Sequence, residues 1–145
     1  MGFKKWFGGK EGEEEVYREL TLATMEKGCM VDYDLKTWTV MDCSTYDYDG
    51  YMTREWELHA GAEVGYLERA EEDGQAEWTF AHRINVNDID EDVVDTIHQR
   101  EDPPEVIHYA GQSYTALESS PGIQRVDGED GEREFISWSY EGNEG

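Results

Sequence analysis

The chain has 145 residues and a formal net charge of −23 at pH 7, with 35 Asp and Glu against 12 Lys and Arg. This length suffices for one hydrophobic core, and the lack of a basic stripe argues against binding nucleic acid. The acids are spread along the whole chain, and high salt would relieve their mutual repulsion, so the composition predicts a salt-adapted, halophilic host.

The first eleven residues depart from this acidic background, because they hold three of the five lysines. Basic and aromatic side chains together favour a membrane interface or an acidic partner surface, and a frayed terminus is the alternative. We therefore predict a tail over residues 1–11, a single β-rich domain over 12–141 and a flexible tail over 142–145. The predicted contact residues of the first tail are Phe3, Lys4, Lys5, Trp6 and Phe7.

A short helix is predicted over residues 12–26, and beyond Gly28 the pattern changes to strands. Alternation of apolar and polar residues predicts strands over 29–33, 37–46, 51–59, 64–70 and 76–84. Asp49-Gly50 and Asp73-Gly74 predict tight hairpin turns between them. In the third of these strands, period 2 places Trp56 and Leu58 on one face, together with Met52 and Arg54, and Thr53, Glu55 and Glu57 on the other.

The main helix is predicted over residues 88–100, with Asn87 as its cap and acidic residues in its first turn. Ile89, Val93 and Ile97 form its apolar stripe, and Pro103-Pro104 end it. Strands are then predicted over 105–109, 113–118, 122–126 and 133–140, the last with Ile136, Trp138 and Tyr140 facing inward. The sum predicts an α+β fold, mainly antiparallel, with eight or nine short strands curled into a barrel or sandwich.

Catalytic motifs are absent from the sequence, which has no nucleophile elbow, phosphate-binding glycine loop or zinc spacing. Acids are so frequent that carboxylate pairs carry no information about acid or base chemistry. The four histidines are far apart in sequence, so an enzyme would need at least two of them to converge on folding. We therefore expect no catalytic residues, no metal and no cofactor, and we leave open whether Cys29 and Cys43 pair.

The most informative side chains are the tyrosines around the Asp49-Gly50 turn. Tyr46, Tyr48 and Tyr51 lie within six residues of one another. Such a cluster could stack a flat or cationic ligand, with nearby acids adding attraction for polyamines or basic peptides. The alternative is that the rings only protect the edge of a hairpin.

The sequence resembles the domain of unknown function 4178 family over roughly residues 20–140. The resemblance rests on Gly28 and the strand that follows it, Trp38-Thr39-Val40, Arg54-Glu55-Trp56-Glu57-Leu58, Gly65-Tyr66-Leu67-Glu68 and Gly111-Gln112-Ser113-Tyr114. It implies a small β-rich cytoplasmic domain linked to bacterial gene clusters for membrane stress and polyamine synthesis. It supplies no catalytic residues.

The sequence therefore predicts a non-enzymatic accessory or adaptor domain in a membrane-stress or polyamine-linked system. The alternative is a β-barrel that binds a small cation. We expect a cytoplasmic protein, with peripheral membrane or protein contacts through the N-terminus, since the chain has no apolar run long enough to span a bilayer and no secretory signal.

Overall fold

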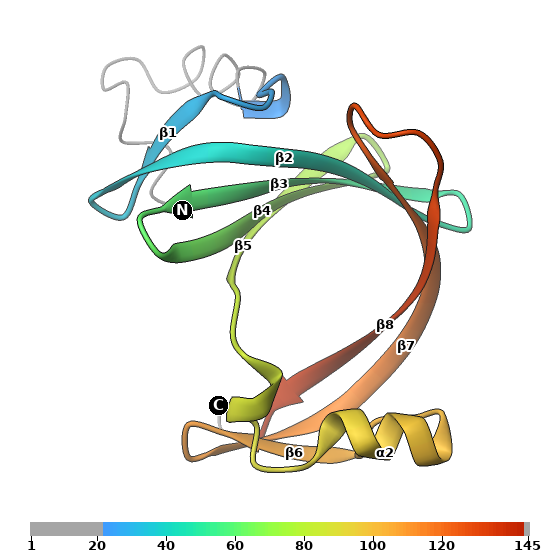
Figure 1. The fold of residues 1–145 in the computed structure, drawn as a ribbon. Helices are drawn as coiled ribbons and strands as arrows, with labels where there is room; N and C mark the ends of the chain where they lie inside the picture. Colours follow the sequence, from blue (N-terminus) through green and yellow to red (C-terminus); the bar gives the residue numbers. More distant parts are fainter. Residues whose placement is uncertain (1–21, 144–145) are drawn as a thin grey trace. The chain divides into compact units, whose positions relative to one another are not determined.

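The structure is a computed structural model that describes residues 22–143. Within that range it is mainly antiparallel sheet with one main helix, which confirms the predicted fold class (Figure 1). Residues 22–23 are also helical, and residues 12–21 of the helix predicted over 12–26 lie outside the described residues. The elements in chain order are β1 (Met30–Tyr33), β2 (Lys36–Tyr48), β3 (Tyr51–Ala60), β4 (Glu63–Glu72), β5 (Gln75–His82), the 3-10 turn η2 (Val86–Asp88), α2 (Val93–Arg100), β6 (Val106–Tyr109), β7 (Gln112–Val126) and β8 (Arg133–Gly142).

The described chain divides into two compact units. Unit 1 comprises residues 22–83 and 124–132, and unit 2 comprises 84–123 and 133–143. The strand β7 contributes residues to both. The domain boundaries predicted from the sequence stay predictions.

Unit 1 is a meander in which β2, β3, β4 and β5 pair in order with their sequence neighbours, and β1 pairs with the start of β2. The turns between β2 and β3 and between β4 and β5 lie at Asp49-Gly50 and Asp73-Gly74, as predicted. All four residues have positive φ angles, which is the backbone that the hairpin turn requires and that Gly and Asp tolerate.

Long strand β2 has different neighbours along one edge. Its first residues pair with β1, and the pairing register with β3 then shifts between Val40 and Asp42, which marks a β-bulge. Beyond the bulge, the amide of Asp127 donates to the carbonyl of Cys43 at 2.9 Å, so the end of β7 and the following turn lie along β2.

The hydrophobic core of unit 1 lies between one face of this sheet and the segment that precedes β1. The indole of Trp56 is fully buried and donates to the carbonyl of Met25 at 2.9 Å, while the indole of Trp38 donates to the carbonyl of Tyr33 at 3.2 Å. Both tryptophans therefore bury their rings while their indole N–H groups form hydrogen bonds. The buried members are Leu22, Met25, Val31, Trp38, Val40, Cys43, Trp56, Leu58 and Leu67.

Unit 2 corrects the predicted start of the helix. The helix α2 begins at Val93 and not at residue 88, and its cap is Asp92, whose side chain accepts from the amide of Asp95. Tertiary contacts hold the residues just before α2 outside the helix, because Ile89 forms a β-bridge with Tyr109 and the Asp90 amide donates to the carbonyl of His108. The predicted end of the helix at Arg100 is confirmed, and Glu101 follows it in the left-handed conformation before the proline pair.

Two further predictions fail in unit 2. The strands expected over 113–118 and 122–126 are one strand, β7, that continues through Pro121. Ile136, expected to face inward on the last strand, is 55% exposed. Among the described residues of unit 2, Ile107 is the one buried hydrophobic side chain, so this unit lacks a core against which such a residue could pack.

Candidate functional site

The sheet of unit 1 has an apolar and a polar face, and the candidate site lies on the polar one. Alternation along each strand places Trp56 and Leu58 on the apolar face and Thr53, Glu55 and Glu57 on the other, as the sequence predicts. The register of the hairpins adds side chains from the neighbouring strands. We call the resulting surface the Tyr/Glu face, formed by Tyr46, Tyr48, Tyr51, Thr53, Glu55, Glu57, Tyr66 and Glu68.

The three tyrosines predicted from the sequence lie together on this face. Tyr48 and Tyr51 are register partners on either side of the turn, with ring centroids 6.5 Å apart. Tyr46 lies two residues before Tyr48 on the same side of β2. The centroids of these two rings are 6.4 Å apart, with an interplanar angle of 21°. The three rings therefore form a row on this face beside the turn between β2 and β3.

Tyr46 connects this row to the carboxylates. Its hydroxyl donates to Glu55 Oε1 at 2.8 Å and accepts from the side-chain amide of Gln124 at 3.2 Å. Burial and then the bond to Glu55 raise the pKa of Tyr46 far above its usual value. Tyr46 is therefore a fixed neutral donor, and it holds one oxygen of Glu55 in place.

The central feature of the face is a pair of glutamates placed directly opposite each other. Glu55 on β3 and Glu68 on β4 are register partners, a position in which like charges destabilise a sheet. Burial raises the pKa of both carboxyls. For Glu55 the bond from Tyr46 partly offsets this effect, and the charges of Glu68 and Glu57 add to it. The pair therefore concentrates negative charge at a partly desolvated position.

Glu57, next on the same face, has a different environment. Its carboxylate lies 2.8 Å from His59 Nε2 and 3.9 Å from an Arg83 nitrogen, and it accepts a long bond from Tyr66. Arg83 also donates to the Tyr66 hydroxyl at 2.5 Å. Glu57 thus has a cation, Arg83, and a histidine as neighbours, whereas no ion pair or hydrogen bond connects the Glu68 carboxylate to any side chain within residues 22–143.

Thr53 adds an unpaired polar group to the face. Its side chain is only 4% exposed, and its hydroxyl oxygen has no hydrogen-bond partner within the described chain. Thr53 is the register partner of Tyr46 on β2 and of Ala70 on β4. A buried hydroxyl without a partner is costly, so such a group calls for an explanation.

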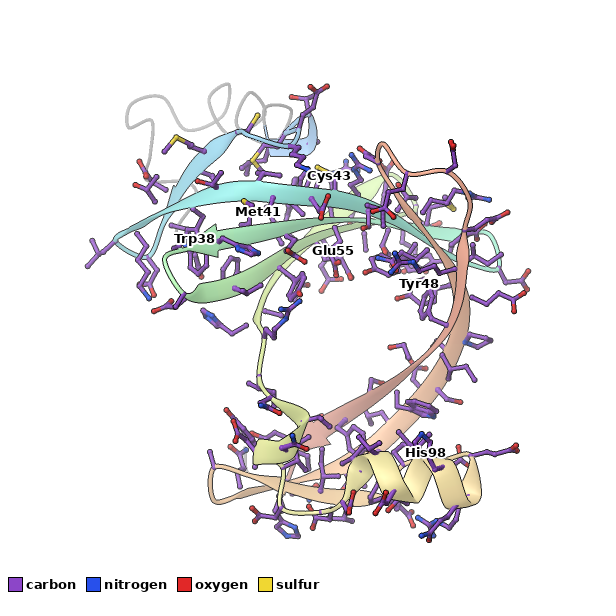
Figure 2. The ribbon with its side chains drawn as sticks, viewed as in Figure 1. Trp38, Met41, Cys43, Tyr48, Glu55 and His98 are labelled. Carbon is purple, nitrogen blue, oxygen red and sulfur yellow. The ribbon has the colours of Figure 1, made fainter. Side chains whose placement is uncertain are left out.

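The remaining candidate residues either lie outside the described part of the chain or are not among the residues of the Tyr/Glu face. Phe3, Lys4, Lys5, Trp6 and Phe7 lie outside the described residues. His59 and His82 lie on opposite faces of the unit 1 sheet, and His108 pairs with Glu91 in unit 2, where His98 lies on α2 (Figure 2). Over residues 22–143, no group of three His, Cys, Asp or Glu side chains is arranged to hold a metal ion.

The cysteines are both free thiols. Cys29 is exposed, and Cys43 is buried in the core of unit 1, where burial raises its pKa. No helix in the described part of the chain is both long and apolar enough to cross a membrane.

Comparison with known proteins places this architecture in a family. The family model described as "Domain of unknown function (DUF4178)" matches residues 26–145. The chain belongs to the DUF4178 family. An uncharacterised protein of Aquifex aeolicus (strain VF5) is 30% identical over 119 residues, which cover 79% of this chain and 65% of the relative. No solved structure matches this DUF4178 chain.

In this DUF4178 domain, sequence reasoning identified the tyrosines but missed the Glu55–Glu68 pair. Period 2 already separates Glu55 from the apolar face, and the two hairpin turns fix which strands are neighbours. The missing step is the register, which pairs residue 55 with 68 only once the turn between β3 and β4 is known to occupy Gly61-Ala62.

Proposed function

We propose that this DUF4178 chain is a non-enzymatic accessory domain that binds an organic polycation, such as a polyamine, on its Tyr/Glu face. The observation that carries the proposal is the partly buried Glu55–Glu68 pair, with no cationic side chain of the described chain bound to Glu68. A bound cation would relieve the repulsion between the two carboxylates. The geometry thus favours the cation-binding alternative over an adaptor without a ligand.

The tyrosine row supports an organic cation over a simple ion. Ammonium groups are attracted to the faces of aromatic rings, and the attraction increases when water is excluded. Tyr46 and Tyr48 present nearly parallel rings beside Glu55, so aromatic and carboxylate groups lie on one continuous surface. A chain with several amino groups could contact both at once. The association that the family resemblance implies with polyamine synthesis agrees with this chemistry.

Calorimetric titration of the full chain with spermidine tests the proposal. We expect saturable binding at constant ionic strength, and at least a tenfold loss of affinity in Glu68→Gln. The matched control is Glu72→Gln, which removes the same charge from an exposed position on the same face of β4. If both variants lose affinity equally, or if magnesium at the same ionic strength gives the same heat, the binding is nonspecific screening and the proposal fails.

A contact between residues 3–7 and a membrane remains a second proposal, based on the lysines and aromatics of that segment. Co-sedimentation with anionic vesicles compares the full chain with a chain lacking residues 1–11. We expect the shorter chain to bind less at moderate salt. Trp6→Ala, which keeps every charge, separates aromatic insertion from electrostatic attraction, and equal binding by the full and shortened chains would contradict the contact.

A further inference from the structure

One edge of the unit 1 sheet has no neighbouring strand. The strand β5 is the last of the meander and pairs with β4, and no other strand of the described chain pairs with it (Figure 1). By contrast, the outer edge of β6 in unit 2 is covered, because the Asp90 amide donates to the carbonyl of His108 and the Glu91 carboxylate accepts from the His108 amide. An uncovered edge presents N–H and C=O groups with which a further strand can pair.

The backbone groups that point outward from β5 follow from its pairing with β4. The Arg83 amide, directly after β5, donates to the carbonyl of Val64 at 3.1 Å. In an antiparallel pair every second residue bonds to the same neighbour, so residues 75, 77, 79 and 81 bond to β4. The residues whose backbone groups point away from β4 are therefore Ala76, Trp78, Phe80 and His82.

The strand β5 lacks the features that usually keep sheet edges apart. Charged side chains, proline and β-bulges are the common protection. This strand has one charged residue, Glu77, and no proline, and its register with β4 runs without a shift. The neighbouring strand β4 carries five charged residues. In a chain with 35 Asp and Glu, β5 is thus an edge that a second acidic chain can approach with little repulsion.

The large side chains of this edge are only partly buried. Trp78 stacks on Trp56 at 5.7 Å between ring centroids, and Phe80 lies edge-on to Trp38 at 5.4 Å. Both rings pack against the core of unit 1, but no residue of β5 is itself buried. A further strand beside β5 would extend the apolar face and cover the outer side of both rings.

The sequence of β5 is complementary to an antiparallel copy of itself. When Thr79 lies opposite Thr79 of the second copy, the outward-pointing residues oppose one another, and Trp78 lies against Phe80 of the other chain. Aromatic pairs of this kind stabilise neighbouring strands. Glu77 then lies opposite Ala81, so no like charges meet across the two strands.

We propose that β5 is a dimerisation edge, to which a second copy of this chain adds its own β5 in antiparallel orientation about a two-fold axis at Thr79. Each opposing pair of outward residues exchanges two N–H···O bonds. Salt strengthens the pairing, because two chains of net charge −23 repel each other at low ionic strength. Thr79 is the register partner of Glu68, so the dimer joins the Tyr/Glu faces of two copies, but its formation needs no bound cation.

Sedimentation equilibrium of the full chain in reducing buffer, at about 0.1 and 1 M KCl, tests the proposal. We expect a monomer–dimer equilibrium whose dissociation constant falls at least tenfold at the higher salt. Ala76→Pro removes an amide that points outward, so it leaves the pairing with β4 intact and should weaken the dimer about tenfold. Ala76→Val is the matched control, because it changes the same side chain but keeps the amide. A monomer at both salt concentrations, or equal dimerisation of the proline and valine variants, would overturn the proposal.

Cross-linking tests the register of the two strands. In a Cys29→Ser background, which removes the exposed native thiol, Thr79→Cys should give a disulfide-linked dimer on oxidation with diamide, because the two sulfurs face each other across the axis. Ala81→Cys is the matched control on the same face of β5. Its two copies would lie roughly 14 Å apart, which is too far for a disulfide. Equal cross-linking of the two variants would show random collision and contradict the pairing.

Discussion

The two faces of the unit 1 sheet belong to the same strands but differ in how well their side chains are packed and paired. On the apolar face Trp56, Leu58 and Leu67 are fully buried, and the Trp56 indole bonds to a nearby carbonyl. On the Tyr/Glu face, partly buried carboxylates stand opposite each other. The first face supplies folding free energy and the second opposes it, which is typical of surfaces kept for function.

Truncation of the apolar face should have the largest effect on stability. Leu58→Ala removes a fully buried side chain that packs beside Trp56 and Leu67. We expect a loss of about 2–5 kcal/mol in the free energy of unfolding, measured with denaturant at fixed salt. Leu117→Ala is the control, because Leu117 is 61% exposed, and it should change stability by less than about 0.5 kcal/mol. Similar losses in the two variants would contradict this account of the core.

Close packing on the apolar face can be tested at Gly65. A Cβ atom there would lie 2.6 Å from Phe80 Cζ. The Phe80 ring has little room to move, since it contacts the rings of Tyr33 and His82 at centroid distances of 4.7 and 5.1 Å. Gly65→Ala should therefore cost about 1–3 kcal/mol by denaturant unfolding. An unchanged midpoint would show that Phe80 can swing aside.

On the Tyr/Glu face, a substitution is expected to stabilise the protein. Thr53→Val keeps the shape of a side chain that is 4% exposed but removes its unpaired hydroxyl. We expect a gain of about 1 kcal/mol in the free energy of unfolding. Thr53→Ser, which keeps the hydroxyl and loses a methyl group, should destabilise instead. A loss of stability in the valine variant would reveal a partner for the hydroxyl.

The smallest effect should come from Glu68 and should depend on pH. Since folding raises the pKa of this carboxyl, the native state binds more protons than the unfolded state as pH rises above the usual glutamate value of about 4.3. The stability contribution of Glu68 is therefore lost as pH rises through the native pKa. Glu68→Gln should stabilise the protein at pH 7 by less than about 1 kcal/mol, and this gain should vanish near pH 4.

Unfolding of the wild type and Glu68→Gln across that pH range provides the measurement. Glu72→Gln on the same strand controls for the loss of one charge from a highly acidic chain. If the gain in Glu68→Gln is independent of pH, repulsion by the carboxylate is not its cause.

Local patterns in the sequence determined the strands and turns of unit 1. Alternation assigned Trp56 and Glu55 to opposite faces, and the Asp49-Gly50 and Asp73-Gly74 turns followed from backbone preferences that depend on only a few residues. The tyrosine row could be predicted for the same reason, because Tyr48 and Tyr51 flank one of these turns.

Tertiary structure decided the rest. Residues 89–91 follow a helical pattern but lie outside the helix, because bonds to His108 and Tyr109 outweigh a weak local preference. The pairings of Glu55 with Glu68 and of Arg54 with Arg69 depend on hairpin register, and a shift of one residue would exchange the faces. The sequence thus determined which residues each face could carry, and only the pairing of strands decided which charges meet.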